Sequence, residues 1–146
     1  MNIGFLGLGK LGLPVSLAVE SKGHNVFGYD ISGQTIDDIK NKKIRYREEW
    51  VDKYLPATNL KILNIDDLVN KCEIIFVPIQ TPHDPLYEGV TKIPKKRIDF
   101  DYSFLKTGIK DLSEAIEKNK EDKVVIIIST VLPGTIRNQI KPLLGS

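Results

Sequence analysis

Short runs of consecutive apolar residues recur along the chain, separated by polar or glycine-containing segments. Five of these runs predict strands, at residues 2–6, 24–29, 60–63, 72–77 and 123–129. The last run contains five consecutive β-branched residues, which favour extended backbone. The runs are mostly continuous rather than alternating, a pattern typical of parallel strands that are covered on both faces.

Segments with helical character lie between these strands. We expect helices at 11–21, 32–40, 65–71 and 102–118, a last helical segment from Pro133-Gly134 toward Leu144, and an irregular or helical excursion at 42–54. In the segment 102–118, apolar residues recur at helical spacing, namely Leu105, Ile109, Leu112 and Ile116. The alternation predicts one α/β domain over residues 1–146, a doubly wound, mostly parallel sheet with helices on both faces.

The segment 78–99 is a long predicted loop that contains four of the eight prolines. Loops of this length inside a compact domain are usually functional or disordered. A basic cluster lies in it, formed by Lys92, Lys95, Lys96 and Arg97. Two interpretations stay open for this cluster, a solvated loop surface and a contact with a nucleotide phosphate.

Charge and composition exclude several classes of partner. The chain of 146 residues has 21 Lys and Arg against 19 Asp and Glu, a net charge of +2, which does not predict binding to nucleic acid or to an anionic membrane. A cationic leader is missing before the apolar N-terminal stretch, and an apolar run long enough to span a bilayer is not found. One cysteine cannot form an internal disulfide, so we expect a reducing, cytoplasmic location.

The sequence Gly7-Leu-Gly-Lys-Leu-Gly12 follows a predicted strand and opens a predicted helix. In this context, the common glycine pattern predicts a dinucleotide-binding turn of the Rossmann type. Gly7 permits a tight turn, Gly9 lets the backbone approach a pyrophosphate, and Gly12 lets the helix pack near the strand. Free backbone N–H groups at the helix start then bind the phosphates. The alternative is a plain strand–helix turn.

Asp30 lies 18 residues after Gly12, at the end of the second predicted strand. Its carboxylate can accept hydrogen bonds from a ribose diol, worth roughly 1.5–3 kcal/mol. It would repel a 2′-phosphate by roughly 4 kcal/mol per unit charge at intermediate dielectric. The next arginine is Arg45, too far along the chain to offset this repulsion. NAD is therefore favoured over NADP, and a strand-end cap is the alternative role for Asp30.

Polar residues follow the fourth and fifth predicted strands, in Val77-Pro-Ile-Gln-Thr-Pro82 and Ser129-Thr-Val-Leu-Pro-Gly-Thr135. Ligands of open α/β sheets bind outside the carboxyl ends of the strands. We therefore expect the hydroxyl groups of Thr81, Ser129 and Thr130 to lie where the nicotinamide and the substrate meet. Simple turn formation by these residues is the alternative.

Together, the glycine turn with its Leu13-Pro-Val15 continuation, Tyr29-Asp30 and these two segments resemble the N-terminal domain of the UDP-glucose/GDP-mannose dehydrogenase family. The resemblance runs from Met1 to about Ile140, and the last two segments are its specific part. It implies an NAD-dependent, four-electron oxidation of a nucleotide sugar from primary alcohol to uronic acid. The nucleotide, UDP or GDP, stays open, and a homo-oligomer is expected for the full enzyme.

The resemblance also implies roles for matching residues. Leu11 would contact the pyrophosphate through its backbone, Asp30 would bind the adenosine ribose, and Thr81 and Thr130 would contact the nicotinamide half. Thr130 is in addition the one expected catalytic residue, because it would help position a water molecule. The full set of expected NAD-binding residues is Gly7, Leu8, Gly9, Lys10, Leu11, Gly12, Asp30, Val77, Pro78, Thr81, Ser129 and Thr130.

The sequence departs from the family at some positions. Thr35 stands where the family often has a basic residue that contacts the ribose, and the loop 83–97 is longer than in many members. The family's nucleophilic Cys, which traps the aldehyde, and its catalytic Lys, Asn and Glu belong to later segments that this sequence does not include. We therefore expect them from a further part of the same or another chain, and expect this chain alone to be inactive.

Cys72, the single cysteine, opens a predicted strand and is expected to be a core thiol. His24 and His83 do not suggest a metal or acid–base pair, and we expect no metal site. Two other functions stay open, a β-hydroxyacid-type dehydrogenase domain and a stand-alone, non-catalytic NAD-binding module.

Overall fold

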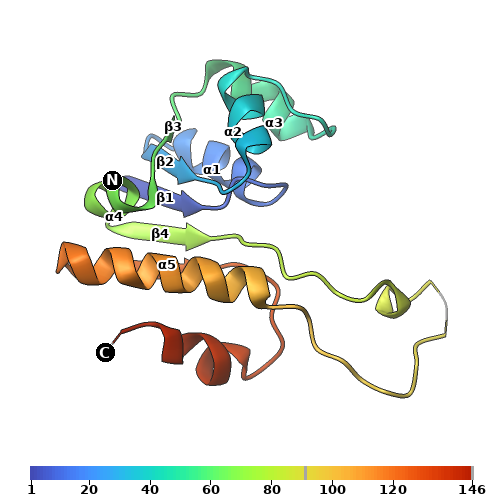
Figure 1. Ribbon diagram of the computed structural model, residues 1–146. Coiled ribbons are helices and arrows are strands. Elements are labelled where there is room, and N and C mark those ends of the chain that lie inside the picture. Colours follow the sequence, from blue (N-terminus) through green and yellow to red (C-terminus); the bar gives the residue numbers. More distant parts are fainter. Residues whose placement is uncertain (91, 146) are drawn as a thin grey trace.

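A computed structural model describes residues 1–90 and 92–145 of the chain. Its centre is a parallel sheet of five strands in the order β3-β2-β1-β4-β5 (Figure 1). The strands are β1 (Asn2–Leu6), β2 (Asn25–Tyr29), β3 (Lys61–Ile62), β4 (Ile74–Val77) and β5 (Val124–Ile127). The order reverses direction between β1 and β4, so the switch point of the sheet lies beside the glycine turn that follows β1.

Helices cover both faces of the sheet, as the sequence predicts (Figure 1). They are α1 (Gly12–Glu20), α2 (Gly33–Lys40), α3 (Glu49–Tyr54), α4 (Ile65–Lys71) and α5 (Ser103–Asn119). Short turns complete the fold, namely the 3-10 turns η1 (Leu55–Ala57), η2 (Pro85–Tyr87) and η4 (Lys141–Leu143), and one π-helical turn, η3 (Ile136–Ile140). Among the described residues, each helix is too short or too polar to cross a lipid bilayer.

Two hydrophobic clusters correspond to the two faces. On one face Leu13 and Leu17 of α1 and Val51 of α3 pack with the first two strands. On the other face, α4 and α5 pack against β4. The fully buried side chains there include Leu68, Ile75, Leu105, Ile109 and Leu112. Within the sheet the rings of Phe5 and Phe76 stack with centroids 5.1 Å apart. The continuous apolar runs are therefore explained by burial from both sides.

Several observed strands are shorter than the sequence suggests, and the C-terminal helical segment is not α-helical. The predicted strands 72–77 and 123–129 are reduced to Ile74–Val77 and Val124–Ile127. The last helical segment forms a π turn followed by a 3-10 turn rather than an α-helix. Pro142 lies in the first turn of η4 and has no N–H to continue an α-helical ladder. The excursion 42–54 is irregular at first and ends in α3.

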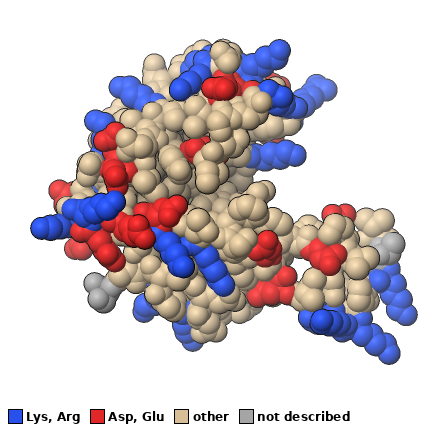
Figure 2. Space-filling view, in the orientation of Figure 1, with Lys and Arg blue, Asp and Glu red and all other residues tan. Residues whose placement is uncertain are grey.

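The arm, defined here as residues 83–90 and 92–100, extends away from the carboxyl ends of the strands (Figure 1). Its base is closed by the Asp101 N–H, which donates to the Pro82 carbonyl oxygen at 2.7 Å. Asp84 caps η2 through the N–H of Leu86, and the Tyr87 hydroxyl donates to the Lys96 carbonyl oxygen at 2.5 Å. Figure 2 shows an open recess between the arm and the upper part of the molecule, which contains α2 and α3.

The outer edge of the sheet on the β5 side is unpaired among the described residues, because β5 pairs with β4 alone. Val124, which begins this strand, is exposed. The strand at this edge is apolar, exposed at Val124 and partly buried over the rest of its length.

Adjacent positions on α5 allow a test of the packing. Leu105 is fully buried, whereas the side chain of Phe104 is exposed. Leu105→Ala should lower the free energy of unfolding by about 2–5 kcal/mol, because a cavity remains after truncation. Phe104→Ala should change it by less than about 0.5 kcal/mol. Urea denaturation measures both, and similar losses in the two variants would contradict this arrangement of α5.

Candidate NAD-binding site

The turn after β1 depends on a glycine at its first position. Gly7 has φ of +116°, a backbone conformation that residues with side chains rarely adopt. The Gly7 N–H donates to the carbonyl oxygen of Tyr29 at 2.8 Å, which joins the ends of β1 and β2. The chain can therefore leave the sheet abruptly and enter α1.

Gly12 is required for a different reason, a close approach of backbone to backbone. A Cβ atom on Gly12 would overlap the carbonyl oxygen of Gly7 and lie 2.8 Å from Cγ of Pro78. The first turn of α1 is thus in contact with both the glycine turn and the segment that follows β4. This contact confirms the helix–strand proximity that the sequence predicts for Gly12.

Gly9 lies at the open side of the turn. A Cβ atom on Gly9 would have no atom within 4 Å. The backbone N–H groups of Gly9, Lys10 and Leu11 have no acceptor among the described residues, and α1 has no side-chain cap at its N-terminus. Uncapped N–H groups at a helix start, beside open space, fit the pyrophosphate of a dinucleotide.

Asp30 is held against the glycine turn by two backbone groups. Its Oδ2 accepts from the Leu8 N–H at 2.7 Å and its Oδ1 accepts from the Ser32 N–H at 2.8 Å. An ionised carboxylate has about four acceptor positions, so two remain for a ribose diol. Leu8 itself is buried, because its side chain packs on Gly28, where a Cβ would lie 2.6 Å from Leu8 Cδ1. Leu8 thus fixes the position of Asp30 relative to the turn.

The polar strand ends after β4 and β5 lie together, as the parallel topology predicts. Ser129 Oγ donates to the Val77 carbonyl oxygen at 3.1 Å, and Thr81 Oγ1 donates to the Thr130 carbonyl oxygen at 2.6 Å. Thr130 is exposed and Thr81 is half-buried, whereas Val77 is buried in the sheet. Pro78, also buried, packs beneath Gly12. It joins this pair of strand ends to the glycine turn, so the expected residues form one continuous surface.

Two tyrosines at this end of the molecule were not predicted from the sequence. The Lys10 Nζ lies 5.9 Å from the centre of the Tyr46 ring, so the segment before α3 reaches the glycine turn. Burial, and then the negative charge of Glu48, raises the pKa of Tyr46 above its usual value. The second is Tyr102, whose hydroxyl contacts the segment after β5. Neither stands in a recognised motif, because their contacts are between residues far apart in the sequence.

Thr35 lies in the first turn of α2, and His83 lies in the arm. The Thr35 N–H donates to Ser32 Oγ at 3.2 Å, which caps α2 as the sequence suggests. His83 lies in the arm, 3.8 Å from Glu88 and edge-on to the ring of Phe100. In the described part of the chain, no group of three or more His, Cys, Asp or Glu side chains could hold a metal ion.

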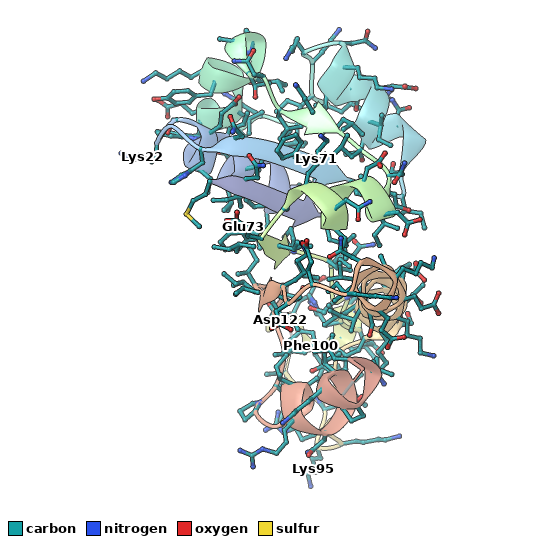
Figure 3. The ribbon with its side chains drawn as sticks, turned by 90° about the vertical axis from the view of Figure 1, so that its left-hand side faces the viewer. Lys22, Lys71, Glu73, Lys95, Phe100 and Asp122 are labelled. Atoms are coloured by element: carbon teal, nitrogen blue, oxygen red, sulfur yellow. The ribbon has the colours of Figure 1, made fainter. Side chains whose placement is uncertain are left out.

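Cys72 is a core thiol at the amino end of β4, away from the glycine turn. It is almost fully buried, and its Sγ would lie 3.2 Å from a Cβ atom on Gly4. Burial raises the pKa of this thiol to about 11, although the nearby Lys123 and Lys71 act in the opposite direction. Figure 3 views this end of the molecule and labels Lys71 and Glu73, the sequence neighbours of Cys72.

The glycine turn generates a paired test. Gly12→Ala should lower the free energy of unfolding by more than about 2 kcal/mol, because the new Cβ overlaps backbone. Gly9→Ala should leave stability within about 1 kcal/mol of the unaltered chain but weaken NAD binding about tenfold or more, because the methyl group lies where the phosphates approach. Urea denaturation and calorimetric titration measure the two quantities. Equal stability losses would contradict the assignment.

Cys72 generates a test of pH dependence. Because its pKa rises from 9.0 to about 11 on folding, the stabilisation by the neutral thiol is present below pH 9 and is lost as pH rises toward 11. The stability advantage of the unaltered chain over Cys72→Ala should therefore shrink between pH 8 and about pH 10. Denaturation at both pH values measures this. A constant difference would show that folding does not raise the pKa of this thiol.

Comparisons with known proteins agree with this geometry. The model of the UDP-glucose/GDP-mannose dehydrogenase family, NAD binding domain, matches residues 1–146. The chain is 28% identical to GDP-mannose 6-dehydrogenase of Pseudomonas aeruginosa over 99% of its length, and 32% identical to a putative UDP-glucose 6-dehydrogenase of Bacillus subtilis over all of it. These alignments cover 32% and 31% of the two relatives, so the chain spans about a third of their length.

A solved ternary complex of GDP-mannose dehydrogenase from Pseudomonas aeruginosa superimposes with a TM-score of 0.81 and 26% identity, over 98% of this chain and 31% of the other. The UDP-D-ManNAc dehydrogenase of Pyrococcus horikoshii gives a TM-score of 0.73 and 27% identity, over 98% of this chain and 32% of the other. With the glycine turn, Asp30 and the paired strand ends in place, the chain belongs to the UDP-glucose/GDP-mannose dehydrogenase family, as its NAD-binding domain.

Proposed function

We propose that the chain is the cofactor-holding part of an NAD-dependent nucleotide-sugar 6-dehydrogenase. The observation that supports this most directly is the continuity of the site. Asp30 bonds to the glycine turn through Leu8, and Pro78 joins that turn to the strand ends bearing Thr81 and Thr130. This continuity supports one extended dinucleotide along the carboxyl edge of the sheet, and we propose that its adenosine lies beside β2 and its nicotinamide beside β5.

Different residues of the site would bind different parts of NAD. The free N–H groups of Gly9, Lys10 and Leu11 would hold the pyrophosphate, and Asp30 would accept hydrogen bonds from the adenosine ribose. Thr81, Ser129 and Thr130 would orient the nicotinamide half, with exposed Thr130 closest to the solvent side, where it would also help hold a water molecule. When NAD is bound, it supplies the hydride acceptor for oxidation of the sugar alcohol.

The substrate proposed is a UDP- or GDP-linked sugar, oxidised at its primary alcohol to a uronic acid. Support comes from the names of the relatives, which include GDP-mannose 6-dehydrogenase and a putative UDP-glucose 6-dehydrogenase. We propose that the covalent chemistry of the sugar requires the part of the enzyme that corresponds to the remaining two thirds of these relatives, in the same or another chain. The complete enzyme is proposed to be a cytoplasmic homo-oligomer.

Asp30 provides the test of cofactor choice. The unaltered chain should bind NAD more tightly than NADP in calorimetric titration, because the carboxylate accepts from the ribose diol and repels a 2′-phosphate. Asp30→Ala should weaken NAD binding by about tenfold or more and leave NADP binding unchanged or stronger.

Asp37→Ala is the matched control, since it removes one negative charge from an exposed position on α2. It should leave both affinities near those of the unaltered chain. Equal losses of NAD and NADP binding in Asp30→Ala would contradict the ribose role. Absence of NAD binding by the unaltered chain at millimolar concentration would overturn the proposed function itself.

A further inference from the structure

The hydroxyl of Tyr102 links the residues just before α5 to the segment after β5. It donates to Oδ1 of Asp99 at 2.6 Å and accepts from the Leu132 N–H at 3.0 Å and from Oγ1 of Thr135 at 3.3 Å. The Tyr102 side chain is 5% exposed and Thr135 is also buried. A phenol has one donor and two acceptor positions, so each hydrogen-bonding position of this hydroxyl has a partner.

These bonds connect the arm to the segment after β5. Asp99 lies at the end of the arm, Tyr102 immediately precedes α5, and Leu132 and Thr135 belong to the turn between β5 and η3. Because α5 is anchored in the core through fully buried residues such as Leu105, the Tyr102 ring has a fixed support. The hydroxyl therefore sets where the turn after β5 lies relative to the sheet.

The same turn carries Thr130, two residues before Leu132. Thr81 fixes one end of the turn through the Thr130 carbonyl oxygen, and Tyr102 fixes the other through the Leu132 N–H. The closing bond of the arm, from the Asp101 N–H to Pro82, lies between Thr81 and Tyr102 in the sequence. The bonds of Thr81, Asp101 and Tyr102 thus form one network around the nicotinamide end of the site.

We propose that Tyr102 is a positioning residue for the nicotinamide half of NAD, an inference that rests on the proposed function. Its hydroxyl acts through the turn after β5 and holds Thr130 at the edge of the site. The adenosine half is independent of this network, because Asp30 and the glycine turn are held by bonds at the ends of β1 and β2. Loss of the hydroxyl therefore affects the two halves of the cofactor differently.

The experiment compares NAD with ADP-ribose, which has the adenosine, the pyrophosphate and both riboses but no nicotinamide. Calorimetric titration of the unaltered chain and Tyr102→Phe gives the ratio of the Kd for NAD to the Kd for ADP-ribose. In Tyr102→Phe this ratio should rise by about threefold or more, while the Kd for ADP-ribose stays within about twofold.

Tyr87→Phe is the matched control. It removes one phenol hydroxyl from η2, where the hydroxyl donates to Lys96 within the arm. The ratio should stay at the value of the unaltered chain. A change in Tyr87→Phe as large as that in Tyr102→Phe would overturn the proposal, because any disturbance of the arm would then suffice.

Two variants of the hydrogen-bond partner test the same point without altering the tyrosine. Asp99→Asn keeps an acceptor for the Tyr102 hydroxyl and should keep the ratio near that of the unaltered chain. Asp99→Ala removes the acceptor and should raise the ratio in the direction of Tyr102→Phe. These variants retain the Tyr102 ring in the core, so they also apply if Tyr102→Phe does not fold.

An unchanged ratio in Tyr102→Phe overturns the inference alone, whether both Kd values stay the same or rise equally. An equal rise in both indicates a general structural role. Absence of NAD binding by the unaltered chain overturns the proposed function, and with it this inference.

Discussion

The lack of a side chain at Gly12 is the constraint on which the carboxyl end of the sheet depends. Because α1 begins in contact with both the Gly7 carbonyl and the Pro78 ring, the helix start, the glycine turn and the exit from β4 share one position. This contact sets the free N–H groups of the turn at the switch point of the sheet. The proposed location of the cofactor thus follows from a packing requirement rather than from any charged residue.

Around this contact, hydrogen bonds fix the two flanks of the site separately. On the flank proposed for the adenosine, the Asp30 carboxylate joins the turn to the start of α2. On the flank proposed for the nicotinamide, Thr81, Ser129 and Tyr102 hold the segments after β4 and β5. Most of these bonds have a backbone N–H or C=O group as one partner. The backbone therefore defines the shape of the site, and this shape exists without the cofactor.

Much of this architecture could be predicted from local sequence. The strands are continuous apolar runs, the glycine turn has characteristic spacing, and Asp30 lies at the end of a strand, so each signal lies within a few neighbouring residues. The strand ends were predicted to converge because parallel topology places them at one edge. The family-level features and the NAD-binding fold are confirmed by the comparisons. The ligand contacts of individual residues stay predictions.

What could not be predicted depends on contacts between distant segments. Tyr102 meets Leu132 across 30 positions of sequence, and Tyr46 meets Lys10 through a loop without a regular pattern. The sequence predicts a helical segment toward Leu144 but not its type, which is a π turn followed by a 3-10 turn. Such features can be recognised only in the folded structure, because there a single hydroxyl group or a missing backbone N–H determines the local course of the backbone.

The open outer edge of β5 has a consequence for the behaviour of this chain in solution. Its unpaired N–H and C=O groups run beside β-branched side chains, which is the arrangement that templates strand addition. Natural sheets cover such edges or break them with charge, and here Asp122 and Lys123 stand only at its beginning. Addition of a strand from a second chain would therefore use this edge, and covering its backbone would prevent such self-association.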